Sequence, residues 1–169
     1  MSRAESGVLE LHPEPYQLEE FTSYIQAVIR PLCEGKNQKL IFDTQTVPGK
    51  VPQMDILRTN QVYFNLLSNA VKYTPEGGQI TVRVKLQQRQ DDLIQIDSEI
   101  SDNGIGMSEQ FQKVLFEPFT QENRNDNSEM RGSGLGLAIV RKIMDAMDGT
   151  ISVESKIGVG TTFRFSLCC

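Results

Sequence analysis

The chain has 169 residues, a net charge of −5 and 38% hydrophobic residues, values typical of a single soluble domain with a proper core. No cluster of lysine and arginine stands out, which argues against nucleic acid as a partner and against direct membrane contact. No apolar run reaches the roughly 18 residues of a membrane span, and the N-terminus lacks the apolar core of a signal peptide, so we expect a cytoplasmic piece. The cysteines Cys33, Cys168 and Cys169 form no CxxC motif and His12 is the single histidine, which argues against a disulfide, a zinc site or a catalytic triad.

The first part of the chain predicts two helices and a short strand. Residues 1–17 are polar and contain prolines, which is typical of a linker. Apolar residues recur at helical spacing over residues 18–35, and "KLIFD", residues 39–43, is a short strand candidate. After a turn-rich segment, Asp55 is a suitable N-cap for a long helix from Ile56 to Tyr73, which "TPEGG" ends.

The second part of the chain predicts mainly strands, with one long helix and one long polar loop. The predicted elements are strands over residues 79–86 and 93–101, a short helix over 108–116, a polar loop over 120–134, an amphipathic helix over 135–149 and a hairpin of strands over 150–155 and 161–167. Together the elements predict an α+β protein. Its fold would be a two-layer α/β sandwich, with a mixed, mostly antiparallel sheet covered by about three helices on one face.

The predicted long helix carries a narrow polar stripe. In "NLLSNAVKYTPEGG", Asn65, Asn69 and Lys72 fall on one side, whereas the rest of the helix is apolar nearly all round. Asparagine is a poor helix former, so these amides need another reason to be there. Amide oxygens suit Mg²⁺ that arrives with nucleotide phosphates, and Lys72 would add a positive charge for the phosphates. The alternative is a surface stripe that binds no ligand.

Two further motifs have the residue types of a nucleotide site. "SDNGIGM" places Asp102 at the end of a strand candidate, where its carboxylate could accept hydrogen bonds from an exocyclic amine; Gly104 and Gly106 would allow a flat ligand to come close. "GSGLGLAIV" has glycines at positions 132, 134 and 136 leading into a helix, so its backbone N–H groups could hold an anion. The spacing matches neither a P-loop nor a dinucleotide-binding turn. Taken singly, each motif is weak and could be a bare turn.

In this order the motifs are far more specific, and the chain resembles the ATP-binding catalytic domain of sensor histidine kinases. That family belongs to a wider superfamily with DNA gyrase, heat-shock chaperone and mismatch-repair ATPases, which share the Bergerat fold. "NQVYFNLLSNAVKYTPEGG" resembles the asparagine box, "DNGIGM" and "GSGLGL" the two glycine boxes, "FEPF" the phenylalanine box, and "GVGTTF" the final strand signal. The resemblance covers residues from about 18 to 167. It implies a catalytic domain over 18–169, preceded by a linker or residual end over 1–17.

The resemblance implies ATP and Mg²⁺ as ligands and assigns roles residue by residue. Asp102 would hold the adenine amine, Asn69 would be the chief Mg²⁺ ligand with Asn65 helping, and Lys72 would reach phosphate. Phe116 and Phe119 would be buried aromatics that anchor the near end of a mobile lid formed by the polar loop. The remaining residues implied to contact the nucleotide are Tyr73, Gly104, Gly106, Met107, Phe119, Gly132, Ser133, Gly134, Leu135, Gly136, Leu137 and Thr162.

The residue type at the position of Asn65 differs between the subclasses of this superfamily. ATP-hydrolysing members have a glutamate four residues before the metal-binding asparagine, and an amide cannot act as a general base. The resemblance therefore implies transfer of the γ-phosphate to a histidine on a separate dimerisation domain, followed by signalling to a response regulator receiver domain. His12 precedes a proline, which does not match the acceptor motif. We expect a monomer that binds ATP but cannot autophosphorylate alone. The alternatives are a regulatory nucleotide-binding module without transfer chemistry and an ATPase of the gyrase or chaperone type.

Overall fold

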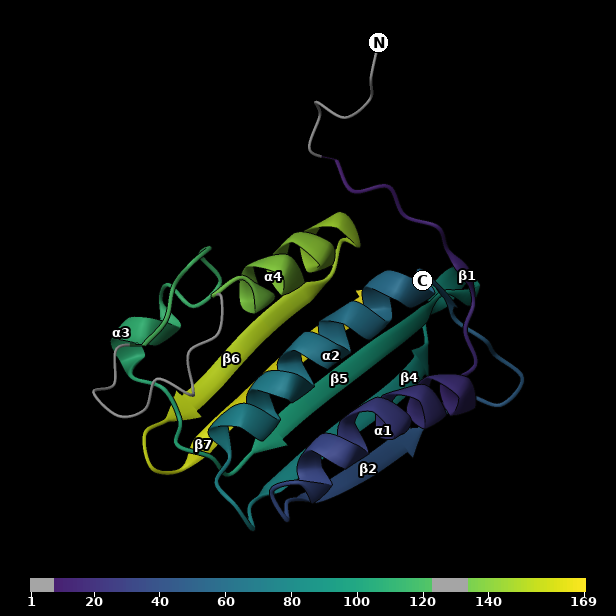
Figure 1. The fold of residues 1–169 in the computed structure, drawn as a ribbon. Helices are drawn as coiled ribbons and strands as arrows, with labels where there is room; N and C mark the ends of the chain where they lie inside the picture. The colour runs from purple at the N-terminus through teal and green to yellow at the C-terminus, as the bar shows by residue number, and fades with distance from the viewer. Residues whose placement is uncertain (1–7, 123–133) are drawn as a thin grey trace.

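A five-stranded sheet with helices on one face forms the body of the computed structural model (Figure 1). The structure describes residues 8–122 and 134–169. The elements in chain order are β1 (Glu14–Pro15), α1 (Leu18–Glu34), β2 (Lys39–Gln45), β3 (Gln53–Met54), α2 (Ile56–Tyr73), β4 (Gln79–Gln88), the 3₁₀ turn η2 (Gln90–Asp92), β5 (Ile94–Asp102), α3 (Glu109–Gln112), α4 (Gly136–Ala146), β6 (Thr150–Lys156) and β7 (Gly160–Cys168).

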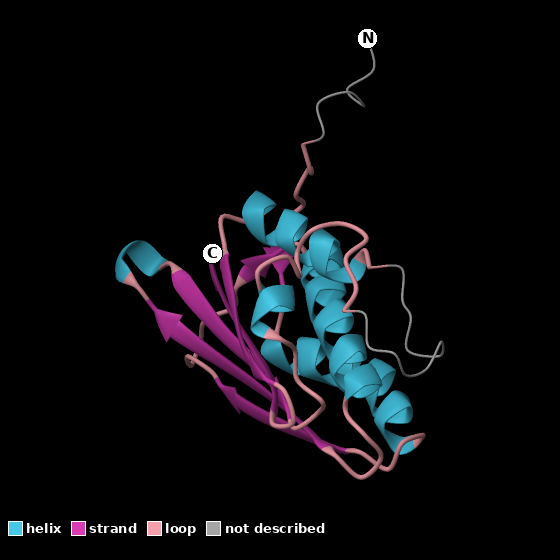
Figure 2. Ribbon diagram, turned by 90° about the vertical axis from the view of Figure 1, so that its left-hand side faces the viewer, coloured by secondary structure: helices cyan, strands magenta, loops and turns pink. Residues whose placement is uncertain are grey.

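The large sheet is mixed but mostly antiparallel. Its strand order is β2-β4-β5-β7-β6; β2 runs parallel to β4 and every other neighbouring pair is antiparallel. The helices α1, α2 and α4 lie side by side on one face, and the other face carries no helix among the described residues (Figures 1 and 2). This arrangement confirms the predicted α+β sandwich.

Alternation along β5 explains how the two layers join. Ile94, Ile96, Ser98 and Ile100 are buried, whereas the residues between them are less buried and belong to the uncovered face. Ser98 shares a hydrogen bond with the hydroxyl of Tyr63 on α2, so the buried polar groups satisfy each other. Burial raises the pKa of the Tyr63 phenol. The central helix is therefore fixed to the central strand by a polar contact inside an apolar core.

Both ends of α2 are capped by side chains. Asp55 accepts a hydrogen bond of 2.9 Å from the backbone N–H of Arg58, which is the N-cap that the sequence predicted. At the other end, the ammonium of Lys36 donates to three carbonyls. These are the carbonyls of Val71, Lys72 and Thr74, at 2.8, 3.2 and 2.7 Å. A lysine here satisfies carbonyls that the helix leaves free and faces the negative end of its dipole.

Two segments differ from the sequence-based expectation. Residues 14–16 pack on the domain: β1 pairs with β3, and Tyr16 is buried and donates a 2.7 Å hydrogen bond to Asn60 Oδ1. The predicted helix over 108–116 is wrong in extent, because α3 spans only Glu109–Gln112 and turns follow it. The N–H groups of Val114 and Glu117 donate to carbonyls three residues back, those of Phe111 and Val114, so tight turns replace the α-helical pattern after Gln112.

Candidate nucleotide site

The polar stripe of α2 lies beside the start of α4. The Nδ2 of Asn65 donates a 3.3 Å hydrogen bond to the carbonyl of Gly136, the first residue of α4. This bond uses the amide nitrogen and leaves the Asn65 amide oxygen available. Among the described residues, no side chain pairs with the Asn69 amide one turn further on. The stripe thus brings the Asn65 amide next to the segment that contains the second glycine motif, with Asn69 one turn further along α2.

Lys72 lies one turn beyond Asn69, close to the end of α2. Its ammonium sits 5.2 Å from the centre of the Tyr73 ring, a cation–π geometry. Partial burial lowers the pKa of the Lys72 ammonium. No carboxylate of the described residues forms an ion pair with it, so its charge is available to an anionic ligand.

Asp102 occupies the last position of β5, on the helix side of the sheet. Its carboxylate accepts a 2.8 Å hydrogen bond from the backbone N–H of Gly104, and the backbone N–H of Thr161 on the neighbouring strand also acts on it. Burial raises the pKa of Asp102, and the two N–H groups oppose this shift because they stabilise the charged form. The site therefore holds a half-buried carboxylate whose remaining lone pairs can accept from a ligand.

The loop after Asp102 approaches other backbone segments closely. The N–H of Ile105 donates to the carbonyl of Tyr73 at 3.1 Å, which joins this loop to the end of α2. A Cβ at Gly104 would lie 2.5 Å from that same carbonyl oxygen. Gly106 has φ +70°, and a Cβ there would lie 2.0 Å from the carbonyl oxygen of Lys156 in the β6–β7 hairpin. These two positions need glycine for the loop to reach both neighbours.

The second glycine motif is described only in part. Gly132 and Ser133 lie outside the described residues. Gly134 has φ +72° and its carbonyl accepts a 3.1 Å hydrogen bond from the N–H of Phe119. Leu135 is the N-cap residue of α4, and Leu137 packs partly against the core. The motif therefore leads into a helix, as predicted.

The expectation that Phe119 is buried is wrong. Its side chain is 75% exposed, and its backbone has φ +60°. Phe116 is only partly buried, but it packs against Phe163 with the ring centres 6.4 Å apart. The two residues between the two aromatics form a turn rather than a helix, so the two rings do not share a face.

The structure places Thr162 on the opposite face of the sheet from Asp102, whereas the residue before it lies on the same face as Asp102. Thr162 lies on the uncovered face of the sheet, where its hydroxyl pairs with that of Ser101 at 2.9 Å. Thr161 pairs directly with Asp102 in the β5–β7 register and is buried on the helix side. Alternation could have found it, because Phe163 and Phe165 mark the core-facing positions of the same strand.

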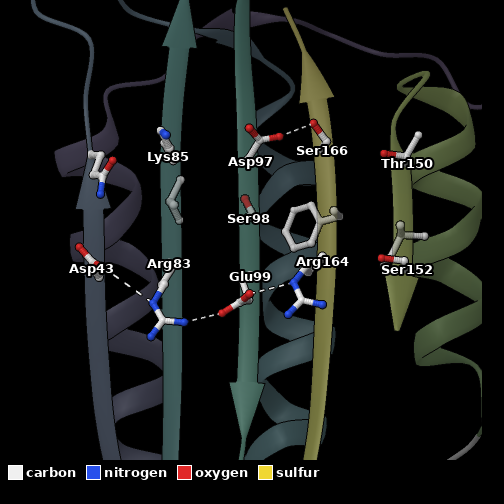
Figure 3. Close-up of a pocket in the computed structure, with 14 residues that line it drawn as sticks. Asp43, Arg83, Lys85, Asp97, Ser98, Glu99, Thr150, Ser152, Arg164 and Ser166 are labelled. Carbon is white, nitrogen blue, oxygen red and sulfur yellow. Dashed lines mark hydrogen bonds and ion pairs between the residues drawn. The ribbon is translucent and has the colours of Figure 1, made fainter. Parts of the chain in front are cut away.

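A groove of about 460 Å³ lies on the uncovered face of the sheet, away from these residues (Figure 3). A row of alternating charges crosses it. Arg83 pairs with Asp43 and Glu99, and Arg164 pairs with Glu99 and Glu154. These exposed charges keep an uncovered sheet face polar, which discourages pairing with other chains. The site that the sequence predicted is on the opposite side of the sheet.

Comparison with known proteins assigns the family. Residues 54–168 match the family described as histidine kinase-, DNA gyrase B-, and HSP90-like ATPase. The chain belongs to this family of ATPases. It is 37% identical over 167 residues to the autoinducer 2 sensor kinase/phosphatase LuxQ of Vibrio cholerae, an alignment that covers 98% of this chain and 19% of LuxQ. The resemblance to sensor histidine kinase catalytic domains is thereby confirmed, and the chain spans about a fifth of the length of this relative.

Solved structures agree on the fold. Full-length ShkA in complex with AMPPNP has 26% identity and a TM-score of 0.74, covering 95% of this chain and 32% of that chain. The catalytic domain of histidine kinase ThkA has 24% identity and a TM-score of 0.77, covering 94% of this chain and 98% of that one. ThkA has also been solved in complex with response regulator protein TrrA. That structure has 23% identity and a TM-score of 0.72, covering 92% of this chain and 41% of that chain.

Asn65 and Asn69 are the candidate protein ligands of a cation at the predicted site. Among the described residues, no group of three or more His, Cys, Asp or Glu side chains gathers in one place. A hard cation that keeps waters and phosphate ligands needs only one or two protein oxygens, and the amides of Asn65 and Asn69 can supply them.

No helix in the described parts of the chain is long and apolar enough to span a membrane.

Proposed function

We propose that this chain binds ATP with Mg²⁺ and donates the γ-phosphate to a histidine on a separate dimerisation domain. Asp102 accepts from the adenine amine, Asn69 and Asn65 hold the cation, and Lys72 neutralises phosphate charge. When bound, the cation offsets negative charge on the phosphates; the chain itself positions the nucleotide and excludes side reactions. Gly104, Gly106 and Tyr73 line the nucleotide, together with Met107, Leu135 and Leu137. The glycines at positions 132, 134 and 136, with Ser133, cover the phosphates.

The observation that carries this proposal is the hydrogen bond from Asn65 to Gly136. It joins the amide stripe of α2 to the second glycine motif at the start of α4. The Tyr73 carbonyl, at the end of the same helix, bonds the loop that follows Asp102. Three motifs far apart in the sequence thus meet around one helix. That convergence is what a ligand with a base at one end and phosphates at the other requires.

Asn65 also supports transfer over hydrolysis. Its amide cannot deprotonate water, and its nitrogen is already engaged with Gly136. The acceptor would come from outside the chain, because His12 is followed by Pro13 in an exposed segment. We further propose a receiver domain as the downstream partner, because ThkA was solved in complex with response regulator protein TrrA. We also propose a monomeric state for this chain.

Phosphate transfer to an added acceptor tests the proposal. The chain is mixed with the histidine-containing dimerisation domain of its parent kinase and with γ-labelled ATP and Mg²⁺. We expect label on that domain and none on this chain alone. Asn69→Ala should abolish both transfer and the tightening of ATP binding by Mg²⁺, whereas Gln45→Ala, which removes an exposed amide at the end of β2, should change neither. ATP binding without transfer would favour the regulatory module, and rapid release of free phosphate would favour the ATPase.

A further inference from the structure

The hydroxyl of Ser155 on β6 joins three segments around the proposed adenine position. Its oxygen lies 2.8 Å from the backbone nitrogen of Met107, 3.0 Å from the carbonyl oxygen of Gly160 and 2.7 Å from Thr161 Oγ1. Ser155 and Thr161 are directly paired across β6 and β7, and Thr161 is paired with Asp102 across β7 and β5. One hydroxyl thus connects the first glycine loop to the strand beside the carboxylate.

The direction of each of these hydrogen bonds follows from the chemistry of the partners. A serine hydroxyl has one proton and two lone pairs. The carbonyl of Gly160 can only accept, so it takes the Ser155 proton, and the amide of Met107 can only donate, so it uses one lone pair. The second lone pair is then left for Thr161, which must donate its own hydroxyl proton to Ser155.

This assignment fixes what Thr161 offers to a ligand. With its proton directed at Ser155, the Thr161 oxygen presents only lone pairs to other groups. Its neighbour Asp102 also presents acceptors, because an ionised carboxylate has no proton to donate. Directly opposed residues on two strands have Cβ atoms about 5 Å apart, so the Asp102 and Thr161 side chains border the same small region on the helix side of the sheet. A 6-amino group suits such a region, whereas a 6-oxo group would meet oxygen lone pairs.

We propose that Ser155 is a specificity-determining positioning residue, which directs the Thr161 proton away from the base and so selects a 6-amino purine over a 6-oxo purine. This inference rests on the proposed function of the site. Gln112 of α3 supports the arrangement: its amide nitrogen donates to the carbonyls of Met107 and Ser155, each at 3.0 Å. The loop and the strand are thereby held at one spacing, which keeps Ser155 within reach of Met107.

The test compares ATP with inosine triphosphate, which has a carbonyl oxygen in place of the 6-amino group. Affinities of both nucleotides are measured by calorimetry for the unaltered chain, Ser155→Ala, Thr161→Val and the double variant. We expect the preference for ATP to fall about tenfold in each single variant, the fold-change of one net hydrogen bond. The preference for ATP should fall no further in the double variant than in the single variants, because both changes remove the same directed proton.

The matched control is Ser152→Ala, which truncates a serine of the same strand on the uncovered face and should leave the preference intact. If Ser155→Ala weakens both nucleotides equally, Ser155 is merely structural and the inference is overturned. The inference is also overturned if the fall in ATP preference of the double variant equals the sum of the two single-variant losses in free energy. Should Ser155→Ala not fold, an unchanged preference in Thr161→Val alone would overturn it. Failure of the unaltered chain to bind ATP would instead contradict the proposed function.

Discussion

Asp102 is a residue whose environment favours binding at the expense of stability. Burial raises the pKa of its carboxyl group, even though the N–H groups of Gly104 and Thr161 stabilise the ionised form. A raised pKa means that the folded protein holds this proton more tightly than the unfolded chain does. At neutral pH the ionised carboxylate therefore costs the folded state free energy, and this cost disappears as the pH falls through the raised pKa.

The variant Asp102→Asn should separate the two effects. We expect its free energy of unfolding at pH 7 to be higher than that of the unaltered chain, because the charge is gone. ATP binding should weaken by about 1–3 kcal/mol, because an amide presents a donor where the amine needs an acceptor. Urea unfolding and calorimetry measure the two quantities. The stability difference should shrink on acidification toward the ordinary carboxyl pKa of about 4. Unchanged ATP affinity would refute the adenine assignment.

The position of a single residue could be predicted from the sequence where one local motif determines it. Asp102 and the glycines at 104 and 106 could be placed from "DNGIGM" alone, because a strand end and a tight loop are local features. Thr162 was predicted at the site, but Thr161 is the threonine on the same face as Asp102, since the side of the sheet depends on register with β5, which is not local. Phe119 was expected inside, but the turn before it directs its ring to solvent.

At the scale of elements, α2 carries much of the proposed site and depends on its C-terminal cap. The Lys36 ammonium contacts three carbonyls there, and Gln38 Nε2 donates to two of the same carbonyls, those of Val71 and Thr74, at 2.9 and 2.6 Å. The α1–β2 turn is fastened to the α2–β4 turn as well, because the N–H of Gly77 donates to the Lys36 carbonyl at 3.1 Å. One turn therefore fixes the end of the helix next to Lys72.

Replacing Lys36 by methionine tests the importance of this cap. Methionine keeps the apolar stem but donates nothing to the three carbonyls, so we expect a loss of about 1–3 kcal/mol in unfolding free energy. Urea denaturation measures this loss. Lys39→Met, an exposed lysine at the start of β2, removes the same charge without touching the helix end and should be close to neutral. Equal denaturation midpoints for the two variants would show that the cap contributes nothing.

Long elements were predictable and short ones were not. The five strands of the large sheet and the helices α1, α2 and α4 follow from periodicity, and Asp55 marked the start of α2 correctly. The two-residue strands β1 and β3 were missed, because two residues carry no periodic pattern and their pairing joins segments 38 or more positions apart. Their partners are chosen by packing around Tyr16 rather than by local propensity.

At the scale of the whole molecule, the segment before α1 closes one end of the core. Tyr16 is buried, its ring meets Phe21 edge-on with centres 5.9 Å apart, and its N–H donates to the carbonyl of Pro52 at 3.0 Å. His12 adds a 2.9 Å bond from its backbone N–H to Asp55, the N-cap residue of α2. These contacts tie residues 12–16 to the start of the central helix, although the sequence suggested a linker up to residue 17.

A chain that begins at Leu18 should therefore be markedly less stable than the full chain. Losing the Tyr16 side chain from the core removes burial comparable to a large-to-small aromatic change, about 3–5 kcal/mol. The point variant Tyr16→Ala should reproduce most of this loss without shortening the chain. Val8→Ala, at a side chain that is 80% exposed, is the control and should leave the urea midpoint unchanged. If the shortened chain unfolds at the same urea concentration as the full chain, the segment is only a linker. A lower midpoint would instead place the edge of the folding unit before Tyr16, because a core aromatic cannot be left outside the domain that buries it.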